Sequence, residues 1–330
     1  MGLLRKVILL LFTPQNIEKI EKFAPKKYEK ILEAIRLEKW MKETDFSKMD
    51  ITKFEYCVIE EGEFPYPLFQ MCFFDNMVCN IIYCLSKGYA PIVKFKDSVE
   101  KNNLWEQFYC QPYQDEQFHS EQITNVKKCD IKRPEIYMPI WPTHDEITLY
   151  ARIFKSVAVL NTETKGYITE EQKNILVGKR VIGCLCRGTD YTANKPSGHP
   201  IQPEIEDVVK HVKEKMKELN CEYVYLATEE KSIKDRFEQA FSRKILTNKR
   251  KYYDEFYKLK ETGGDGTRIS WVHHERKNDN KLKSLEYLSS LYILSNCNAL
   301  IAGNTGGSRM ALYLNDNQYE YWHLFNLGMY

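Results

Sequence analysis

Arginine, glycine, a hydroxyl and a carboxylate follow one another directly after an apolar run that is typical of a buried strand. The run is Val181–Cys186, and the four residues after it are Arg187, Gly188, Thr189 and Asp190. In an open α/β sheet, ligands bind outside the carboxyl ends of the strands. The planar guanidinium group matches a phosphate, and glycine lets a ligand approach the backbone closely. These residues would equally suit a surface turn with an ordinary Arg–Asp ion pair.

Two further predicted strands end in polar loops. Residues 223–227 are followed by Thr228 and Glu229, and residues 299–302 are followed by a loop rich in glycine and hydroxyl groups. Parallel strands bring their carboxyl ends to one edge of a sheet, and the last loop also begins a helix, where free N–H groups bind phosphate. Any one loop would suit an ordinary turn, but the three together favour a phosphate site. The last loop contains Asn304, Thr305, Gly306, Gly307 and Ser308.

The second half of the chain alternates between the two periodicities that distinguish helices from strands. Strands are predicted at 180–186, 223–227, 244–246 and 299–302, and helices at 205–219, 233–241, 282–294 and 309–314. A polar, glycine-rich loop is predicted over 248–280. The pattern is typical of a parallel sheet covered by helices.

The first half contains a shorter alternation of the same kind. A strand at 54–59, a helix at 68–85 and a strand at 89–95 predict a βαβ unit, whose loop at 60–67 carries several acidic residues. The proline-rich stretch Pro134–Pro142 is the best candidate linker. We therefore predict an α/β protein with two domains, 1–141 and 142–330.

Composition excludes several classes of function. The 330 residues are 43% hydrophobic and include 48 basic and 46 acidic residues, a net charge of +2, so nothing indicates a nucleic-acid partner. One basic cluster is typical of a solvated face; it consists of Lys244, Lys249, Arg250 and Lys251.

The ten cysteines and the apolar segments bear on location. The cysteines are scattered, and several lie in apolar runs, which predicts reduced, buried thiols and a cytoplasmic protein. Cys184 and Cys186 share one face of a strand, where core packing is favoured over a metal site. The apolar run Val7–Phe12 is too short to span a bilayer. Peripheral contact with a membrane and the oligomeric state stay open.

The three loops, in this order, resemble those of the core α1,6-fucosyltransferases and the related protein O-fucosyltransferases. Asp190 precedes His199-Pro200 by the family's nine residues. The segment 227–230, Ala-Thr-Glu-Glu, resembles the family's second motif, and Ser284–Arg309 is similar to the third. The resemblance covers most of 54–95 and 134–320.

This resemblance implies a GT-B architecture, in which two Rossmann-like domains face each other across a cleft. The N-terminal domain would lie on the acceptor side, and the C-terminal domain would bind the donor. The implied activity is inverting, metal-independent transfer of a sugar from a nucleotide diphosphate, GDP-fucose in the family. The acceptor would be a glycan or a lipid-linked saccharide in surface polysaccharide or glycoconjugate synthesis, as in bacterial-type polysaccharide glycosyltransferases. No cofactor or metal ion is implied.

The resemblance also assigns roles by position. Arg187 would hold the β-phosphate and neutralise the leaving diphosphate, which some cation must do when no metal is present. Gly188 and Thr189 would lie beside it, and Thr305 and Ser308, with the rest of the Asn304–Ser308 loop, would assist at the phosphates. The donor pocket would also be lined by Asp190, Thr228 and Glu229.

Three positions depart from the family pattern. The family's guanine-binding histidine falls at Leu185, its guanine-binding aspartate falls near Ser290, and its catalytic carboxylate falls at Lys195. A lysine is protonated unless it is buried, so it is a poor general base.

The base that deprotonates the acceptor could therefore be Asp190, Glu61 or Glu63, of which we take Asp190 and Glu63 as candidates. Lys195 and His199 are candidate contacts to the donor or acceptor. The alternative is a catalytically silent protein that binds a nucleotide sugar and regulates or scaffolds polysaccharide assembly.

Overall fold

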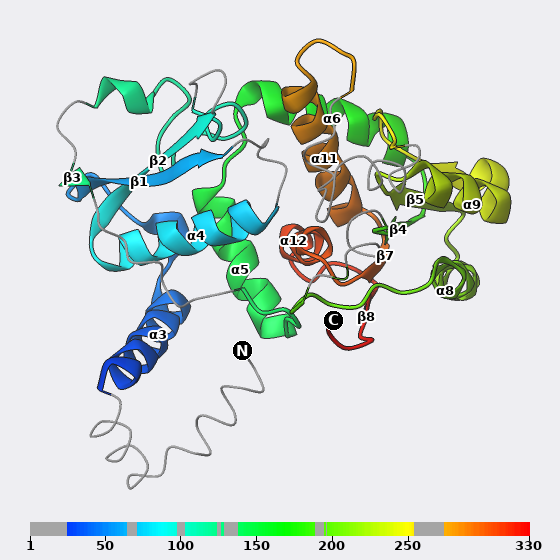
Figure 1. Ribbon diagram of the computed structural model, residues 1–330, viewed down its shortest axis with the longest axis horizontal. Helices are drawn as coiled ribbons and strands as arrows, with labels where there is room; N and C mark the ends of the chain where they lie inside the picture. Colours follow the sequence, from blue (N-terminus) through cyan, green and yellow to red (C-terminus); the bar gives the residue numbers. More distant parts are fainter. Residues whose placement is uncertain are drawn as a thin grey trace, which may run out of the picture. The chain divides into compact units, whose positions relative to one another are not determined.

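The computed structural model of the chain describes residues 25–64, 71–97, 103–123, 127–128, 138–188, 195, 197–253 and 274–330. The described residues form two compact units, and the main division between them in the sequence falls between Asn161 and Thr162. Most of the chain before this point belongs to the first unit, and Thr162–Tyr330 makes up most of the second (Figure 1).

The first unit contains a three-stranded sheet in the order β2-β1-β3, in which β1 and β3 run parallel. The predicted βαβ unit is present as β1, α4 and β2. The elements of this unit are α3 (Pro25–Glu43), η1 (Phe46–Lys48), β1 (Glu55–Phe64), α4 (Met71–Ser86), β2 (Tyr89–Asp97), η2 (Ser120–Gln122), β3 (Lys127–Lys128) and α5 (His144–Val157).

The first strand is longer than predicted. The loop predicted from Glu60 onward is strand as far as Phe64, so Glu61 and Glu63 belong to β1. Their side chains lie outside the described part of the structure. The acidic residues interrupt the apolar pattern that marks a strand, and pairing with neighbouring strands holds the backbone extended nonetheless.

Helix α5 lies in the first unit, so the units divide later than the predicted boundary after residue 141. A capping box between Thr143 and Glu146 begins the helix, with Glu146 N donating to Thr143 Oγ1 over 3.3 Å. The helix packs against η1, and Arg152 Nη2 donates to the carbonyl oxygen of Met41 over 3.2 Å. These contacts join the helix to residues far before it in the chain.

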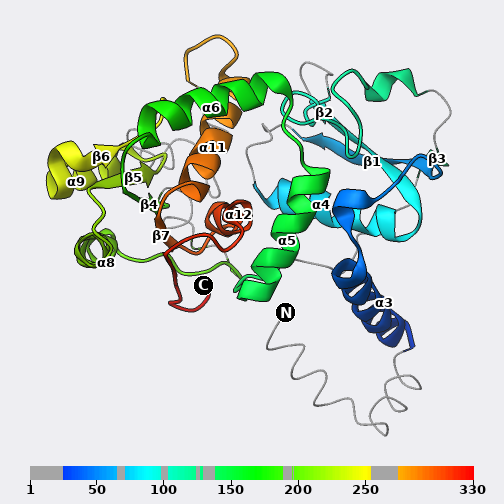
Figure 2. The same cartoon turned by 180° about the vertical axis from the view of Figure 1, so that it is seen from behind.

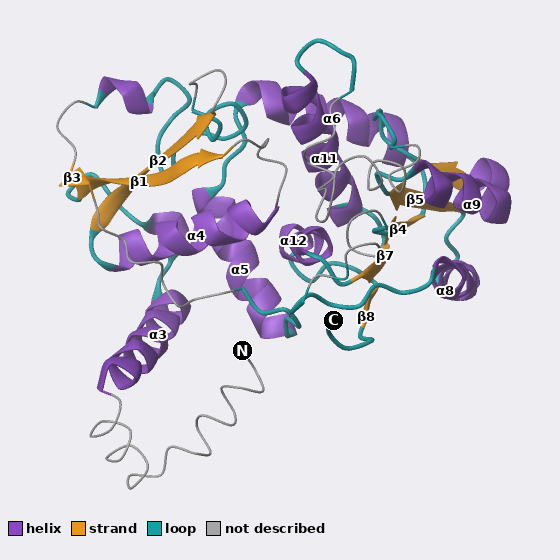
Figure 3. Ribbon diagram, viewed as in Figure 1, coloured by secondary structure: helices purple, strands orange, loops and turns teal. Residues whose placement is uncertain are grey.

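The second unit contains a five-stranded sheet in the order β6-β5-β4-β7-β8, and all its paired strands are parallel (Figure 3). The order reverses between β4 and β7, which is the switch point of a Rossmann-like sheet. The predicted α/β class with a parallel sheet is therefore confirmed. The strands are β4 (Val181–Leu185), β5 (Tyr223–Ala227), β6 (Ile245–Leu246), β7 (Ala299–Gly303) and β8 (Tyr321–Phe325), of which β8 was not predicted.

Helices cover both faces of this sheet (Figures 1 and 2). Helices α8 and α9 pack on one face, and α11, which contacts α6 and α12, packs on the other. Side chains such as Ile182 and Cys184 enter the core under α8 and α9. The elements are α6 (Thr162–Leu176), α8 (Ile205–Glu218), α9 (Lys231–Phe241), η3 (Ser242–Lys244), α11 (Asp279–Ser295) and α12 (Gly306–Asn315).

The cysteines differ in state. Cys184 and Cys186 are free and buried, with their sulfur atoms 3.7 Å apart in the core, so packing accounts for both. Cys57 is disulfide-bonded, and its partner lies outside the described side chains. The prediction of reduced thiols is therefore wrong at Cys57. No helix within the described ranges is both long and apolar enough to cross a membrane.

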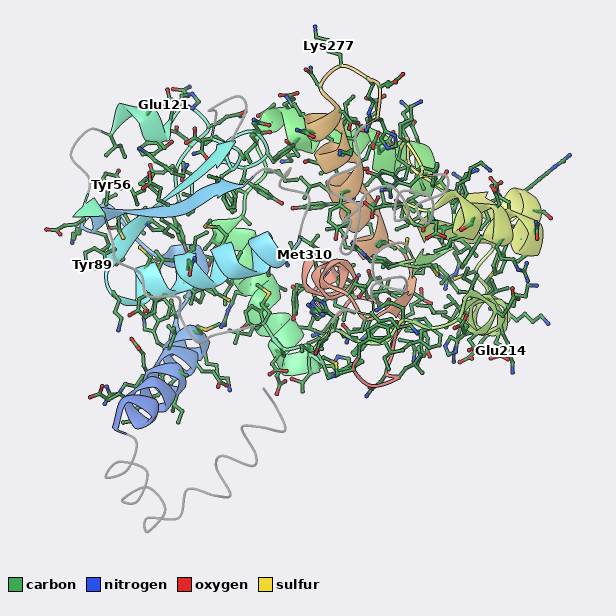
Figure 4. All side chains as sticks on the ribbon, in the orientation of Figure 1. Tyr56, Tyr89, Glu121, Glu214, Lys277 and Met310 are labelled. Atoms are coloured by element: carbon green, nitrogen blue, oxygen red, sulfur yellow. The ribbon has the colours of Figure 1, made fainter. Side chains whose placement is uncertain are left out.

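Two histidines stack where β8 meets α8. The rings of His211 and His323 are 4.6 Å apart, and His211 Nε2 lies 2.9 Å from Tyr321 Oη. Burial lowers the pKa of both histidines, and the charge of His211 further lowers the pKa of His323. Glu214, on the exposed side of α8 (Figure 4), raises the pKa of His211 only as a lesser contribution.

We expect the melting temperature to fall as the pH drops below about 6.5, the unperturbed histidine pKa. Below this pH, His211 and His323 bind protons more readily in the unfolded chain than in the folded protein, so acid favours unfolding. At higher pH both histidines are neutral in both states, and this loss of stability is absent. Thermal unfolding between pH 7.5 and 5.5 measures the fall, which should be smaller in His323→Phe. His119 is exposed, so the control variant His119→Phe should show the same fall in melting temperature as the wild type. An unchanged pH profile in His323→Phe would contradict this assignment.

Candidate functional site

A pocket lies in the second unit at the carboxyl ends of β4, β5 and β7. This is the edge where an open α/β sheet binds its ligand. Helix α11 supplies one wall. The pocket is lined by Leu185, Cys186, Arg187, Gly188, Ala227, Thr228, Glu229, Arg250, Tyr287, Ser290, Leu291 and Thr305. Five of the residues predicted to bind a donor therefore line one pocket: Arg187, Gly188, Thr228, Glu229 and Thr305.

The loop after β4 packs tightly against the start of α9. A Cβ atom on Gly188 would collide with the carboxylate of Glu230 and would come within 2.9 Å of Ile233 Cδ1. Only glycine leaves the loop in this position without displacing its neighbours. Arg187, the residue before it, is half-buried and lines the pocket. The close packing beside Gly188 therefore fixes where the backbone of the arginine lies.

The structure describes only some of the other residues that were predicted to take part in the site. Thr189 and Asp190 lie outside the described residues. Lys195 is exposed and has a backbone φ of 42°, and His199 is also exposed. The candidate base Glu63 belongs to β1 in the first unit, and its side chain is not described. The roles of all five residues stay predictions.

The loop after β5 places a carboxylate in the pocket. Glu229 is held through its carbonyl oxygen, which accepts a hydrogen bond of 2.8 Å from Tyr253 N. Its Oε1 atom lies 3.4 Å from Arg250 Nη2, and the Glu229 side chain is 14% exposed. Thr228 Oγ1 accepts from Glu230 N over 3.3 Å, which steadies the turn. In Rossmann-like sheets an acidic residue near this position binds ribose hydroxyl groups.

The loop after β7 begins α12 with a capping box. Thr305 Oγ1 accepts from Ser308 N over 3.2 Å, and Ser308 Oγ accepts from Thr305 N over 2.8 Å. Ser308 is fully buried and caps the helix, whereas Thr305 lines the pocket. Asn304, also fully buried, accepts from Arg309 Nη1 over 2.9 Å. The hydroxyl of Ser308 thus has a structural task, and its predicted role at a phosphate stays a prediction.

The glycines of this loop allow close packing at the helix terminus. A Cβ atom on Gly307 would lie 2.8 Å from Tyr287 Oη and 3.3 Å from side-chain atoms of Leu185 and Leu291. Gly306 and Gly307 are the first residues of α12, so their N–H groups belong to the positive end of the helix dipole. An anion in this part of the pocket would meet these groups.

Arg250 lines the pocket, although the sequence predicts that it lies on a solvated face. The basic cluster around it predicts a solvated face, and Lys249 fits that prediction because its side chain is 75% exposed. The side chain of Arg250 is only 5% exposed and lines the pocket. The signal in the sequence was its place four residues after β6, at the same edge as the other loops.

A network of charged residues lies at the start of α11. Arg276 donates from Nη1 to Glu286 Oε1 over 2.5 Å and from Nε to Asp279 Oδ1 over 2.6 Å. Burial raises the pKa of Asp279, but hydrogen bonds from His274 N and Arg276 outweigh it, so the pKa is lowered. Lys283 Nζ lies 3.4 Å from Asp279 Oδ2. This network holds the first turns of the helix that carries Tyr287 and Ser290.

Metal binding has no support from the described side chains. No group of three or more His, Cys, Asp or Glu residues among them is arranged to hold a metal ion. The predicted metal independence stays a prediction.

Comparison with known proteins identifies no family. No family model matches the sequence, and no curated protein matches it. Among solved structures, the chain is similar to the fucosyltransferase NodZ from Bradyrhizobium, with 13% identity, a TM-score of 0.45 and coverage of 79% of this chain and 93% of that chain. It is also similar to POFUT1 in complex with GDP, with 9% identity, a TM-score of 0.46 and coverage of 84% and 99%.

Proposed function

We propose that this protein is a glycosyltransferase whose second unit binds a nucleotide diphosphate sugar. The donor we favour is GDP-fucose, and the acceptor is a glycan of a surface polysaccharide or glycoconjugate. The observation that carries the proposal is the pocket at the switch point of the parallel sheet. There Arg187, Glu229 and Thr305, the N-cap of α12, line one pocket.

The chemistry of transfer needs such a site. As the glycosidic bond breaks, negative charge develops on the leaving diphosphate. In the proposed mechanism Arg187 and the N–H groups of α12 take up this charge without a metal ion. As that bond breaks, the acceptor oxygen forms a bond to the anomeric carbon from the opposite face, which inverts the configuration there, and a base accepts the proton of the acceptor hydroxyl. We propose Asp190 or Glu63 for that step.

The position of Lys195 motivates a second candidate function. A lysine, which has no carboxylate to accept a proton, stands where the resemblance implies a carboxylate, and this lysine is exposed. A protein that binds the donor without transferring the sugar would tolerate that change. Tight donor binding without turnover on any glycan acceptor would favour this regulatory or scaffold role.

A thermal-shift screen tests the donor site. The full chain is melted with GDP-fucose, GDP and UDP-, dTDP- and CMP-sugars. A ligand at a hundred times its dissociation constant adds about 2.7 kcal/mol to the free energy of unfolding, which raises the melting temperature measurably. We expect GDP-fucose and GDP to raise it. If no nucleotide or nucleotide sugar does, the proposed function is wrong.

A further inference from the structure

Arg250 has hydrogen-bonding capacity that the described protein does not use. Its Nη1 donates to Ser290 Oγ over a long 3.3 Å, and its Nη2 lies 3.4 Å from Glu229 Oε1. Its Nε is buried and has no hydrogen-bond partner among the described residues. The side chain is 5% exposed, so water does not readily replace the missing partners. A buried donor without an acceptor costs free energy, which an acceptor on a ligand would recover.

The strand that precedes Arg250 lies three strand positions from the strand that precedes the helix terminus, and the Arg250 side chain reaches Glu229 and Ser290. Thr305 follows β7 and Arg250 follows β6, and β4 and β5 lie between these strands. Three strand spacings are about 14 Å. If the diphosphate lies by Arg187 and α12, as the proposed function requires, the ribose falls beside Glu229 at the end of β5. The nucleobase then reaches Arg250.

The pocket that Arg250 lines suits a flat ring with a polar edge. Ser290 and Leu291 come from α11, and Leu185 ends β4, so the same pocket offers apolar side chains for a flat ring and polar groups for its edge. Asn248 links the end of β6 to β5 and to helix α11, which carries Ser290. Its Oδ1 accepts from Tyr225 Oη over 3.0 Å, and its Nδ2 donates to the carbonyl oxygen of Glu286 over 2.9 Å.

We infer, on the basis of the proposed function, that Arg250 recognises the nucleobase of the donor through two neighbouring acceptors. A guanidinium group presents only donors, and guanine offers the acceptors O6 and N7 side by side. Adenine places an amino donor beside its N7 and cannot pair with both. Arg250 thus supplies the base contact, while Leu185 and Ser290 occupy the positions where the family resemblance implies a histidine and an aspartate.

Binding measurements with altered bases test this inference. Titration calorimetry compares GDP, 7-deaza-GDP, which lacks N7, and ADP on the full chain. We expect wild type to bind 7-deaza-GDP and ADP each about tenfold more weakly than GDP. In Arg250→Gln, GDP binding should weaken and the difference between GDP and 7-deaza-GDP should vanish. Lys249→Gln removes the same charge from the neighbouring exposed side chain and should preserve the difference.

The outcomes separate this inference from the proposed function. If wild type binds no nucleotide, both are wrong. If it binds GDP and 7-deaza-GDP equally well, or if Arg250→Gln weakens GDP, ADP and pyrophosphate by one common factor, the inference is overturned and the donor site stands. Thermal unfolding checks that Arg250→Gln folds. Should it not fold, Arg250→Lys, which keeps the charge beside Glu229, should still narrow the ratio of GDP to 7-deaza-GDP affinity.

Discussion

Arg187→Lys is expected to lower the rate of sugar transfer by at least a hundredfold while the fold stays intact. Lysine keeps the positive charge but loses the planar guanidinium group, which can donate two parallel hydrogen bonds to two oxygens of the diphosphate. Removing one well-placed donor from developing negative charge typically costs a factor of about 10² to 10³ in rate. The measurement is the initial rate of transfer from GDP-fucose, with the circular dichroism spectrum and melting temperature recorded on the same samples.

A matched control lies at the other end of the same strand. Arg180 directly precedes β4, is exposed, and its Nη2 bonds Glu320 Oε2 over 2.6 Å. Arg180→Lys makes the same chemical change away from the pocket and should leave transfer unchanged. Full activity in Arg187→Lys would refute the assignment of Arg187 to the diphosphate.

Arg276→Ala is expected to destabilise the protein by about 3 kcal/mol, because it removes one partner of a buried ion pair. Glu286 bonds both terminal nitrogens of Arg276, over 2.5 and 3.0 Å, and Asp279 bonds its Nε. Both carboxylate side chains are only 8% exposed. Without the arginine, Asp279 keeps Lys283 at 3.4 Å, whereas Glu286 loses both of these bonds. Urea-induced unfolding of the full chain measures the loss.

The control for this prediction is an arginine pair of similar geometry at the surface. Arg236 bonds both carboxylate oxygens of Glu206, over 2.5 and 2.6 Å, but the two side chains are 34% and 66% exposed. Arg236→Ala should lower the free energy of unfolding far less than Arg276→Ala does, since water replaces the lost partner. Equal losses in the two variants would show that burial does not set the strength of the Arg276 pair.

Local pattern predicted much of the second unit. The strand at 223–227 has the predicted bounds, and the strand at 180–186 and the helix at 205–219 are each within two residues of them. These segments carry their periodicity in consecutive residues, so no distant contact is needed to recognise them. The strand Tyr321–Phe325 escaped prediction because it pairs with one neighbour only and is mostly half-buried, which leaves little alternation in its sequence.

Charged and polar residues were the harder cases. Lys249 and Arg250 are adjacent basic residues that both follow β6, and their place after the strand does not tell which one enters the pocket, yet Arg250 is buried there and Lys249 is exposed. Ser308 was predicted beside a phosphate from its place in a Gly- and Thr-rich loop, and the structure shows its hydroxyl in the helix cap. A polar side chain can face water, a backbone group or a ligand, and only its surroundings decide among these.

By itself, the sequence determined the α/β class, the alternation of strands with helices and the three polar loops that end β4, β5 and β7. These follow from propensity and periodicity, which act between residues close in the chain. Only the tertiary structure decided the strand order, which gathers Arg187, Glu229 and Thr305 around one pocket and brings Arg250 to the same pocket. Strand order depends on which distant segments bury each other's apolar faces, and no short stretch of sequence contains that information.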